Sequence, residues 1–296
     1  MTKDMTNGSP MKLILGFSIP LLFGYLFQQF YNLVDTLIVG RFLGVDALAA
    51  VGSTGSLNFL IIGFCMGVCN GFAIPLAHKF GAGDYRGLRA FMVNAIYLSA
   101  IFAVVMTAVT VVFCRPILEL MRTPDNIIDG AYLYIVIIFA GIPATYLYNL
   151  ISAIIRSMGD SKTPVVFLVI SSVMNIALDL VFIINLHLGV AGASLATVIS
   201  QGVSAILVTR SLMKSYGILK LELRAIRFHG ALLKSELKIG LPGGIQSFGY
   251  SISNIIIQAV INNFGTDTAA AWAAYGKLDA IFWTVCGSFG IAITTF

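Results

Sequence analysis

Residues 13–40 read LILGFSIPLLFGYLFQQFYNLVDTLIVG and contain one charged side chain, that of Asp35. A helix needs about 20 apolar residues to cross the hydrocarbon core of a bilayer, so this stretch is long enough to span a membrane. Further stretches with few or no charges follow at 47–77, 90–114, 130–155, 163–186, 188–209, 239–266 and 268–296. We therefore predict an all-α polytopic membrane protein with eight transmembrane helices. Strands of a membrane barrel would instead alternate in hydrophobicity over about ten residues, and these stretches do not.

The composition excludes the soluble alternatives. Hydrophobic residues make up 58% of the 296-residue chain and charged residues 10%, whereas soluble domains have about 25% charged residues. A mean hydropathy of +0.93 leaves too little polar surface for a globule in water and excludes intrinsic disorder and a nucleic-acid-binding module. The four cysteines all lie inside apolar stretches, so we predict neither a disulfide framework nor a zinc site.

The basic residues predict how the chain is oriented. With the N-terminus in the cytoplasm, 14 Lys and Arg side chains fall in cytoplasmic segments, and the outer loops hold only Arg41, Arg115 and Arg122. Cytoplasmic loops of membrane proteins carry an excess of Lys and Arg. We therefore predict a multi-pass protein of the plasma membrane with a cytoplasmic N-terminus.

A basic segment, 211–238, divides the chain. It contains six Lys and Arg residues, with Arg210 directly before it, and the apolar Leu219, Leu221, Leu223, Leu232 and Leu233. Such a mixture is typical of a segment that lies on the membrane surface. We predict three parts: a six-helix lobe at 1–210, a cytoplasmic interfacial linker at 211–238, and the start of a second lobe at 239–296.

Two pairs of similar sequences flank this linker. SIPLLFGYLFQQF, from Ser18, corresponds to GLPGGIQSFGYSI, from Gly240, and GVDALAAVGSTGSL at 44–57 corresponds to GTDTAAAWAAYGKL at 265–278. Matched blocks in the same order indicate an internal repeat of six helices, with the two copies parallel. Only two helices of the second copy are present, so we expect a C-terminally truncated twelve-helix protein.

Two carboxylates inside predicted spans are the main functional signal. A carboxylate near the middle of a span costs roughly 2.5–3.5 kcal/mol on insertion scales, and such residues usually face a cavity. Asn175 precedes Asp179 by four residues, which places the amide and the carboxylate on one helical face. Gln28, Tyr31 and Asp35 form a similar polar face on the first helix. We expect the two faces to meet around water or an ion; for each Asp, a helix-end position at the interface is the alternative.

The chemistry of these side chains limits the ion. Carboxylate and amide oxygens suit a proton or a hard cation such as Na⁺, and do not suit zinc or copper. Lys277 and Asp279 are two apart and point to different faces, so both a cavity role and an interfacial role stay open for them. Gly63, Gly67 and Gly71 form a GxxxGxxxG stripe, which is typical of close helix packing.

Three motifs resemble one family of transporters. YNLVDTLIVGRFLGVDALAAVG (31–52), RSMGDSKTP (156–164) and GVAGASLATVISQ (189–201) are similar to the corresponding segments of multidrug and toxic compound extrusion (MATE) transporters of the prokaryotic branch. The resemblance extends over essentially the whole chain. It implies one lobe and part of another from a V-shaped twelve-helix antiporter in a prokaryotic cell membrane.

The resemblance also implies a function. It predicts export of drugs and organic cations by alternating access against a H⁺ or Na⁺ gradient, by a monomer that has no cofactor and no metal other than Na⁺ at the coupling site. The family's cation site is implied at Asp35, Asn175, Asp179 and Thr197, the last only through the resemblance. We predict that Gln28, Tyr31 and Asn149 line the substrate cavity. A second acidic site on the seventh helix, found in the other branch, has no counterpart because 239–266 holds no carboxylate.

Three rival functions can be weighed from the sequence. A lipid or polysaccharide flippase of the same superfamily would have a more cationic cavity, but the first six predicted spans contain no Lys or Arg. A major-facilitator transporter is suggested by GAGDYRGLR at 81–89, where two residues rather than the required three separate Gly and Asp. An enzyme is disfavoured, because no buried His, Cys–His pair or metal-ligand spacing is present. The flippase is the main alternative.

Overall fold

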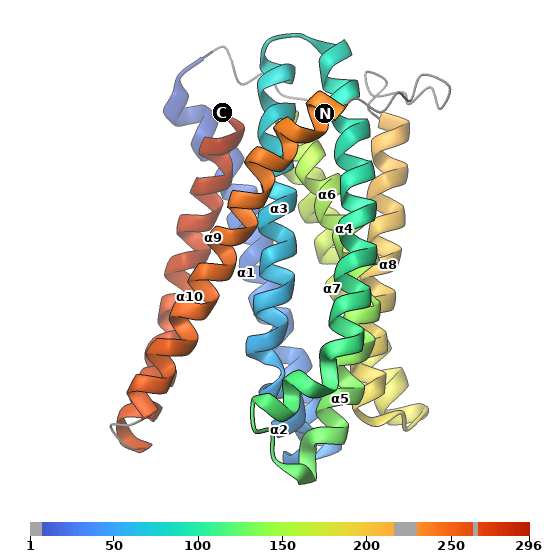
Figure 1. Cartoon of the computed structure of the whole chain (residues 1–296), viewed down its shortest axis with the longest axis vertical. Coiled ribbons are helices and arrows are strands. Elements are labelled where there is room, and N and C mark those ends of the chain that lie inside the picture. Colours follow the sequence, from blue (N-terminus) through green and yellow to red (C-terminus); the bar gives the residue numbers. More distant parts are fainter. Residues whose placement is uncertain (1–7, 216–229, 263–265) are drawn as a thin grey trace.

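The computed structural model describes residues 8–215, 230–262 and 266–296, and throughout these ranges it contains helices and no strand (Figure 1). The predicted all-α architecture is therefore confirmed. The helices are α1 (Pro10–Leu43), α2 (Val45–Ser53), α3 (Gly55–Gly81), α4 (Tyr85–Leu120), α5 (Asp125–Ala140), α6 (Ile142–Ser157), α7 (Lys162–Leu180), a π-helical turn η1 (Val181–Asn185), α8 (Gly189–Ser215), α9 (Gly230–Asn262) and α10 (Thr266–Thr295).

Length and apolar composition identify the membrane-crossing segments among the described residues. Five segments qualify singly, and the pair α5–α6, bent by 46°, makes a sixth. Helices α9 and α10 occupy the stretches predicted as the seventh and eighth spans. Many large apolar side chains on these helices are exposed, including Phe23, Val104 and Ile206, as expected for surfaces that contact lipid.

Two predicted spans are interrupted, which sequence analysis did not anticipate. The second span is divided at Thr54 into α2 and α3, and the fourth bends at Gly141 between α5 and α6. The bend has a local cause: Pro143 follows Gly141 and has no N–H to donate to the preceding turn. Hydropathy did not reveal these breaks because the side chains on both sides are equally apolar.

The fifth predicted span is also irregular. Helix α7 ends at Leu180 and continues as the π-helical turn η1, which begins two residues after Asp179. Single π-turns inside helices are frequent at functional sites because they change the direction of the side chains that follow. This irregularity therefore lies directly next to one of the two predicted carboxylates.

The predicted linker, 211–238, is partly helical. Helix α8 continues to Ser215 and α9 begins at Gly230; residues 216–229, which include Leu219, Leu221 and Leu223, lie outside the described ranges. Leu232 and Leu233 pack against the main apolar core. The interfacial linker and the division into two lobes stay predictions.

The main core joins α1 through α8 and part of α9. Its largest fully buried side chains include Phe72 on α3, Met92 on α4, Phe139 on α5 and Tyr146 on α6. A smaller cluster, Leu13, Phe17 and Leu21 with Ala292, joins α1 to α10. Helix α1 therefore contacts α7 on one side and α10 on the other.

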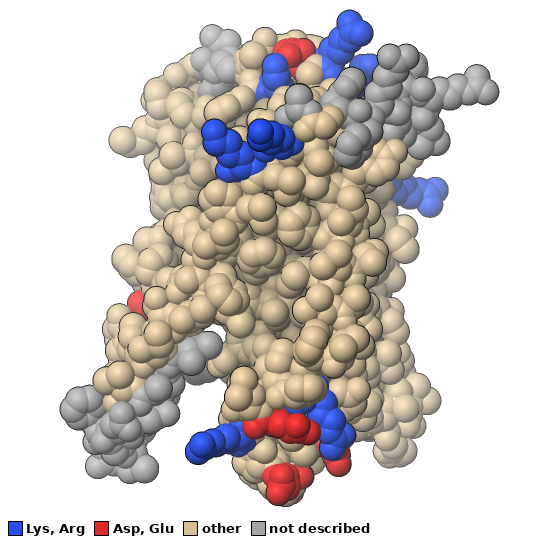
Figure 2. Space-filling model, in the orientation of Figure 1, with Lys and Arg blue, Asp and Glu red and all other residues tan. Residues whose placement is uncertain are grey.

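Helices α9 and α10 meet the rest of the molecule at one end only. Their upper parts lie against α3 and α1, while their lower ends stand apart from α2 and α5 (Figure 1). The space-filling view is hollowed at this lower end, and most Lys and Arg side chains visible on this face gather at the upper end (Figure 2). An almost uncharged belt separates the two ends, as expected for a membrane protein.

The glycine stripe on α3 is partly explained by this packing. A Cβ on Gly67 would lie 2.5 Å from the backbone oxygen of Gly243, and one on Gly71 would lie 2.6 Å from Cα of Gly240. Gly63, in contrast, has open space around it. Close packing against α9 therefore accounts for two of the three glycines.

Candidate cation-binding site

Three helices bring the predicted cation-site residues together. Asp35 comes from α1, Asn175 and Asp179 from α7, and Thr197 from α8; α7 packs against both other helices. Asn175 and Asp179 are fully buried, with 0% exposure, whereas Asp35 and Thr197 are partly buried. The set gathers in the interior of the α1–α8 bundle.

Asn175 is at the centre of this hydrogen-bond network. With its amide oriented to suit its neighbours, Nδ2 donates to Asp179 Oδ2 at 2.9 Å. Its side-chain oxygen accepts from the Thr197 hydroxyl at 3.2 Å and from the Thr197 backbone N–H at 3.1 Å. The Thr197 hydroxyl also lies 3.1 Å from the Ala193 carbonyl oxygen. Asn175 thus fixes the Asp179 carboxylate relative to α8.

The two carboxyl groups are immediate neighbours. Asp35 and Asp179 lie within hydrogen-bonding reach of each other when one of them carries a proton. The Oδ1 atom of each carboxyl is buried and has no hydrogen-bond partner among the described residues. Two adjacent carboxylates cannot both be charged in an apolar interior without a compensating cation.

Two tyrosines, Tyr31 and Tyr134, lie next to the two carboxyl groups. Tyr31, one helical turn before Asp35 on α1, lies near Thr197, Asp35 and Asp179. Tyr134 on α5 is 8% exposed and lies near Asp35, Asp179 and Tyr31. Sequence analysis predicted Tyr31 for the substrate cavity and did not identify Tyr134. No sequence pattern around Tyr134 predicts that its side chain faces this cluster.

The other two predicted cavity residues are not joined to the cluster by any hydrogen bond seen in the described ranges. Asn149 Nδ2 donates to the carbonyl of Thr145 in its own helix, at 2.8 Å. Gln28 lies two helical turns before Asp35 on α1 and is partly buried. Their assignment to a substrate cavity stays a prediction.

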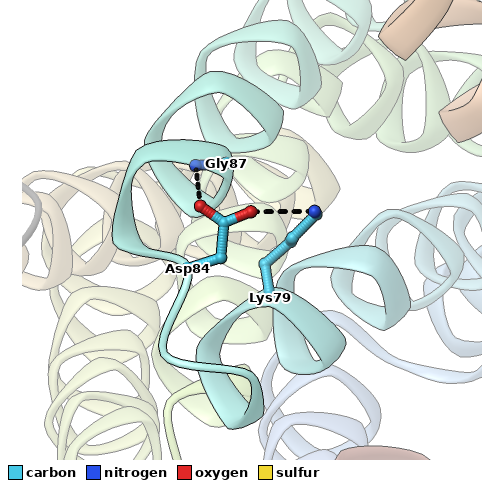
Figure 3. Close-up of polar contacts among 3 residues, drawn as sticks. All are labelled: Lys79, Asp84 and Gly87. Carbon is cyan, nitrogen blue, oxygen red and sulfur yellow. Dashed lines mark hydrogen bonds and ion pairs between the residues drawn. The ribbon is translucent and has the colours of Figure 1, made fainter.

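Two acidic residues outside the spans, Asp84 and Asp160, stabilise the starts of helices. Asp84 caps the N-terminus of α4 by accepting from Gly87 N at 2.8 Å, and it forms an ion pair with Lys79 at 2.8 Å (Figure 3). These interactions hold the pKa of the Asp84 carboxyl below its usual value, with the hydrogen bond from Lys79 the larger cause. Asp160, in the RSMGDSKTP motif, accepts from the backbone N–H groups of Lys162 and Thr163 at the start of α7.

Glu236 is a buried carboxylate that sequence analysis placed in the linker. It is 0% exposed, and neither of its oxygens has a hydrogen-bond partner in the described part of the chain. Because Glu236 precedes the apolar stretch at 239–266, the sequence did not indicate that it is buried.

On α10, Asp279 accepts a hydrogen bond from the exposed Tyr275 hydroxyl at 3.2 Å.

The chemistry of the cluster is that of a small hard cation or a proton. Its potential ligands are two carboxylates, an amide and hydroxyl groups, all of which present oxygen. No group of three or more His, Cys, Asp or Glu side chains suited to a metal ion occurs in the described ranges. The arrangement can hold one positive charge between Asp35 and Asp179.

Comparison with known proteins gives one consistent result. The MatE family model matches residues 20–181, more than half of the chain. The probable multidrug resistance protein YoeA of Bacillus subtilis is 33% identical over 303 residues, which cover 100% of this chain and 65% of that protein. The chain thus spans about two thirds of the length of this relative.

Solved structures agree in fold. A MOP superfamily transporter from Pyrococcus furiosus, described as having a binding pocket of reverse polarity that suggests a different function, is 27% identical with a TM-score of 0.93. A multidrug resistance MATE family transporter in an outward-facing conformation is 26% identical with a TM-score of 0.92. Each match covers 100% of this chain and 66% of the other. The chain therefore belongs to the MatE family, whose members are membrane transporters and not enzymes.

Proposed function

We propose that this chain forms the cation-binding part of an antiporter that exports drugs or organic cations in exchange for H⁺ or Na⁺. The observation that carries the proposal is the buried pair Asp35 and Asp179, held by Asn175 and Thr197 inside the α1–α8 bundle. The name of the Bacillus subtilis relative supports drugs as the substrate class.

The mechanism follows from the unfavourable free energy of the Asp35–Asp179 pair when no cation is bound to it. When no cation is bound, two neighbouring carboxylates in a dry interior repel each other and lack solvation, so this state favours water entry or proton uptake. A bound cation removes both penalties. Occupancy therefore changes which arrangement of α1 against α7 is most stable.

Helix α1 can transmit that change. It carries Asp35 at one end, and near its other end Leu13, Phe17 and Leu21 pack against Ala292 of α10. A shift of α1 that relieves or restores the carboxylate pair therefore also moves the surface that α10 rests on. The hollow at the lower end of the molecule (Figure 2) is then the outward-open side in this proposal.

The orientation and location are part of the same proposal. The basic end in Figure 2 would face the cytoplasm, where Lys and Arg accumulate in membrane proteins. The N-terminus would be cytoplasmic, the membrane a prokaryotic cell membrane and the working unit a monomer. A flippase for an anionic lipid-linked substrate is the less favoured alternative, because the first six predicted spans contain no Lys or Arg.

The test separates cation binding from exchange. A cation that binds only the folded protein raises its melting temperature, because ligand binding stabilises the folded state by mass action. We expect Na⁺ or mild acid to raise the Tm of the purified protein by several degrees, and Asp179→Asn to abolish the increase. Asp46→Asn is the matched control, because Asp46 is exposed on α2. A wild-type response in Asp179→Asn would refute the cation site.

Exchange is measured in membrane vesicles. Drug transport is followed while the Na⁺ and H⁺ gradients are collapsed one at a time. We expect collapse of one gradient to stop wild-type transport, and Asp35→Asn and Asp179→Asn each to stop it as completely as the double variant, because the two groups act as a unit. Cation binding without gradient-driven drug transport would refute antiport and leave the binding site standing.

A further inference from the structure

An open groove lies between α6 and α8 at the basic end of the molecule. Its volume is about 490 Å³, and it is lined by Leu147, Ile206, Thr209, Arg210, Met213 and Lys214. It is separate from the carboxylate cluster, which involves other positions on α8. Nothing in the proposed transport cycle uses it.

Five of the six lining residues form one face of α8. Residues 206, 209, 210, 213 and 214 follow the spacing of three and four that places side chains on one side of a helix. At a rise of about 1.5 Å per residue, Arg210 lies about 6 Å along the axis from Ile206, and Lys214 about 6 Å beyond it. The face is therefore apolar at Ile206 and carries both cations nearer the end of the helix, with Met213 between them.

The apolar part faces outward. Ile206 and Met213 are each 65% exposed and Leu147 is 38% exposed. Because these side chains belong to segments that cross the membrane, their exposed surface contacts acyl chains and not water. The groove floor is thus suited to a hydrocarbon chain.

The cationic part of the groove consists of Arg210 and Lys214. Arg210 and Lys214 are exposed, and within the described ranges neither forms an ion pair, in contrast to Lys79, which is paired with Asp84. Thr209 already donates its hydroxyl to the Ala205 carbonyl at 2.6 Å, so the two basic side chains are the available donors. Two unpaired cations above an apolar groove complement an anionic headgroup with an attached acyl chain.

We propose that this groove binds an anionic phospholipid, with the phosphodiester between Arg210 and Lys214 and an acyl chain along Leu147, Ile206 and Met213. Basic pockets between transmembrane helices on the cytoplasmic side bind such headgroups. The inference rests on the cytoplasmic placement of the basic end and is independent of cation exchange. A soluble phosphate would engage the two cations but leave the apolar floor without a partner.

The experiment uses native mass spectrometry of the purified protein with phosphatidylglycerol or phosphatidylcholine of identical acyl chains. We expect saturable binding of phosphatidylglycerol and at least tenfold weaker binding of phosphatidylcholine. Each juxtamembrane cation contributes about fivefold to such binding. Arg210→Gln with Lys214→Gln should therefore weaken phosphatidylglycerol binding about 25-fold. Met213→Ser should weaken it less, through the acyl chain.

The matched control removes two other cations from the same end of the molecule. Arg86→Gln with Lys162→Gln changes the net charge equally at two exposed positions outside the groove and should leave binding within about twofold of wild type. Glycerol 3-phosphate at millimolar concentration should not displace the lipid. Three results would each overturn the proposal: wild-type binding in the groove variant, equal loss in the control variant, or displacement by glycerol 3-phosphate.

Discussion

Asn175 Nδ2 lies 2.9 Å from Asp179 Oδ2, one helical turn away on α7, and the same amide accepts two hydrogen bonds from Thr197 on α8. One side chain therefore positions the carboxylate and ties together the two helices that present it. Removing Asn175 would deprive the buried Asp179 carboxylate of this donor and would remove the side-chain hydrogen bonds between α7 and α8.

The first prediction concerns this amide. Asn175→Ala should destabilise the folded protein by about 2 kcal/mol, because unpaired buried polar groups retain their desolvation cost. It should also weaken the Tm increase caused by the bound cation. Thermal unfolding with and without Na⁺ measures both effects. Asn32→Ala, at an exposed position on α1, is the control and should behave as wild type.

The second prediction concerns the contact between α3 and α9. Gly67→Ala places a methyl group 2.5 Å from the Gly243 oxygen and should cost about 1–3 kcal/mol by overpacking. Gly63→Ala meets nothing within 4 Å and should be neutral or slightly stabilising, because alanine favours helix. The melting temperatures of the two variants test this. An equal loss in both would show that glycine is needed for a reason other than helix contact.

The third prediction is a pH dependence. The pKa of Asp84 is lowered in the folded state, chiefly by Lys79. Its ionised form therefore contributes stability above its unfolded pKa, and this contribution is lost as pH falls through the lower folded pKa. Asp84→Asn keeps the helix cap and removes the charge. The Tm difference from wild type should be present at pH 7 and shrink toward pH 2.

Alanine at the same position separates the cap from the charge. Asp84→Ala removes the bond to Gly87 as well, so its Tm should lie below that of Asp84→Asn at every pH. If the two variants melt together throughout the titration, the side chain does not cap α4.

The fourth prediction concerns Glu236. Folding buries this carboxylate with no hydrogen-bond partner among the described residues, which is unfavourable whether it stays charged or takes up a proton. Glu236→Leu should therefore raise the Tm by several degrees, since its neighbours Leu232, Leu233 and Leu237 are apolar. Glu119→Leu, at an exposed position, should give no such gain. A lower Tm for Glu236→Leu would mean that the carboxylate has a stabilising partner.

The fifth prediction is the orientation in the membrane. In a Cys286→Ser background, where the remaining cysteines are buried, Lys162→Cys should react with an impermeant maleimide only from the cytoplasmic side. Leu120 is the last residue of α4, at the other end of the molecule from Lys162, and is 83% exposed, so Leu120→Cys should react only from outside. The reverse pattern in intact cells would invert the proposed topology.

Sequence analysis predicted the helices well because each span is long and apolar, and this pattern does not depend on the identity of any single residue. It also placed Asn175 and Asp179 on one face, because helical spacing alone determines that relationship. Thr197 came only from the family resemblance, since a threonine in an apolar helix is unremarkable by itself.

The features that sequence analysis did not predict depend on the path of the backbone and on contacts between residues distant in sequence. The break at Thr54, the bend at Gly141 and the π-turn after Asp179 do not alter hydropathy. Tyr134 joins the cluster because α5 packs against α8, which carries Thr197, and Glu236 lies on α9, which packs on α3. Neither packing arrangement can be read from a local pattern.

The backbone contact between Gly67 and Gly243 has a consequence for motion. Helices that interdigitate through large side chains must lift those side chains out of grooves before they can turn against each other. At Gly67 and Gly243 themselves the contact is between backbone atoms, and the rings of Phe64 and Phe72 on α3 lie against Gly244 and Gly240 of α9 one turn to either side. Any rotation of α9 against α3 would therefore pivot about the Gly67–Gly243 contact and require those two aromatic side chains to change rotamer.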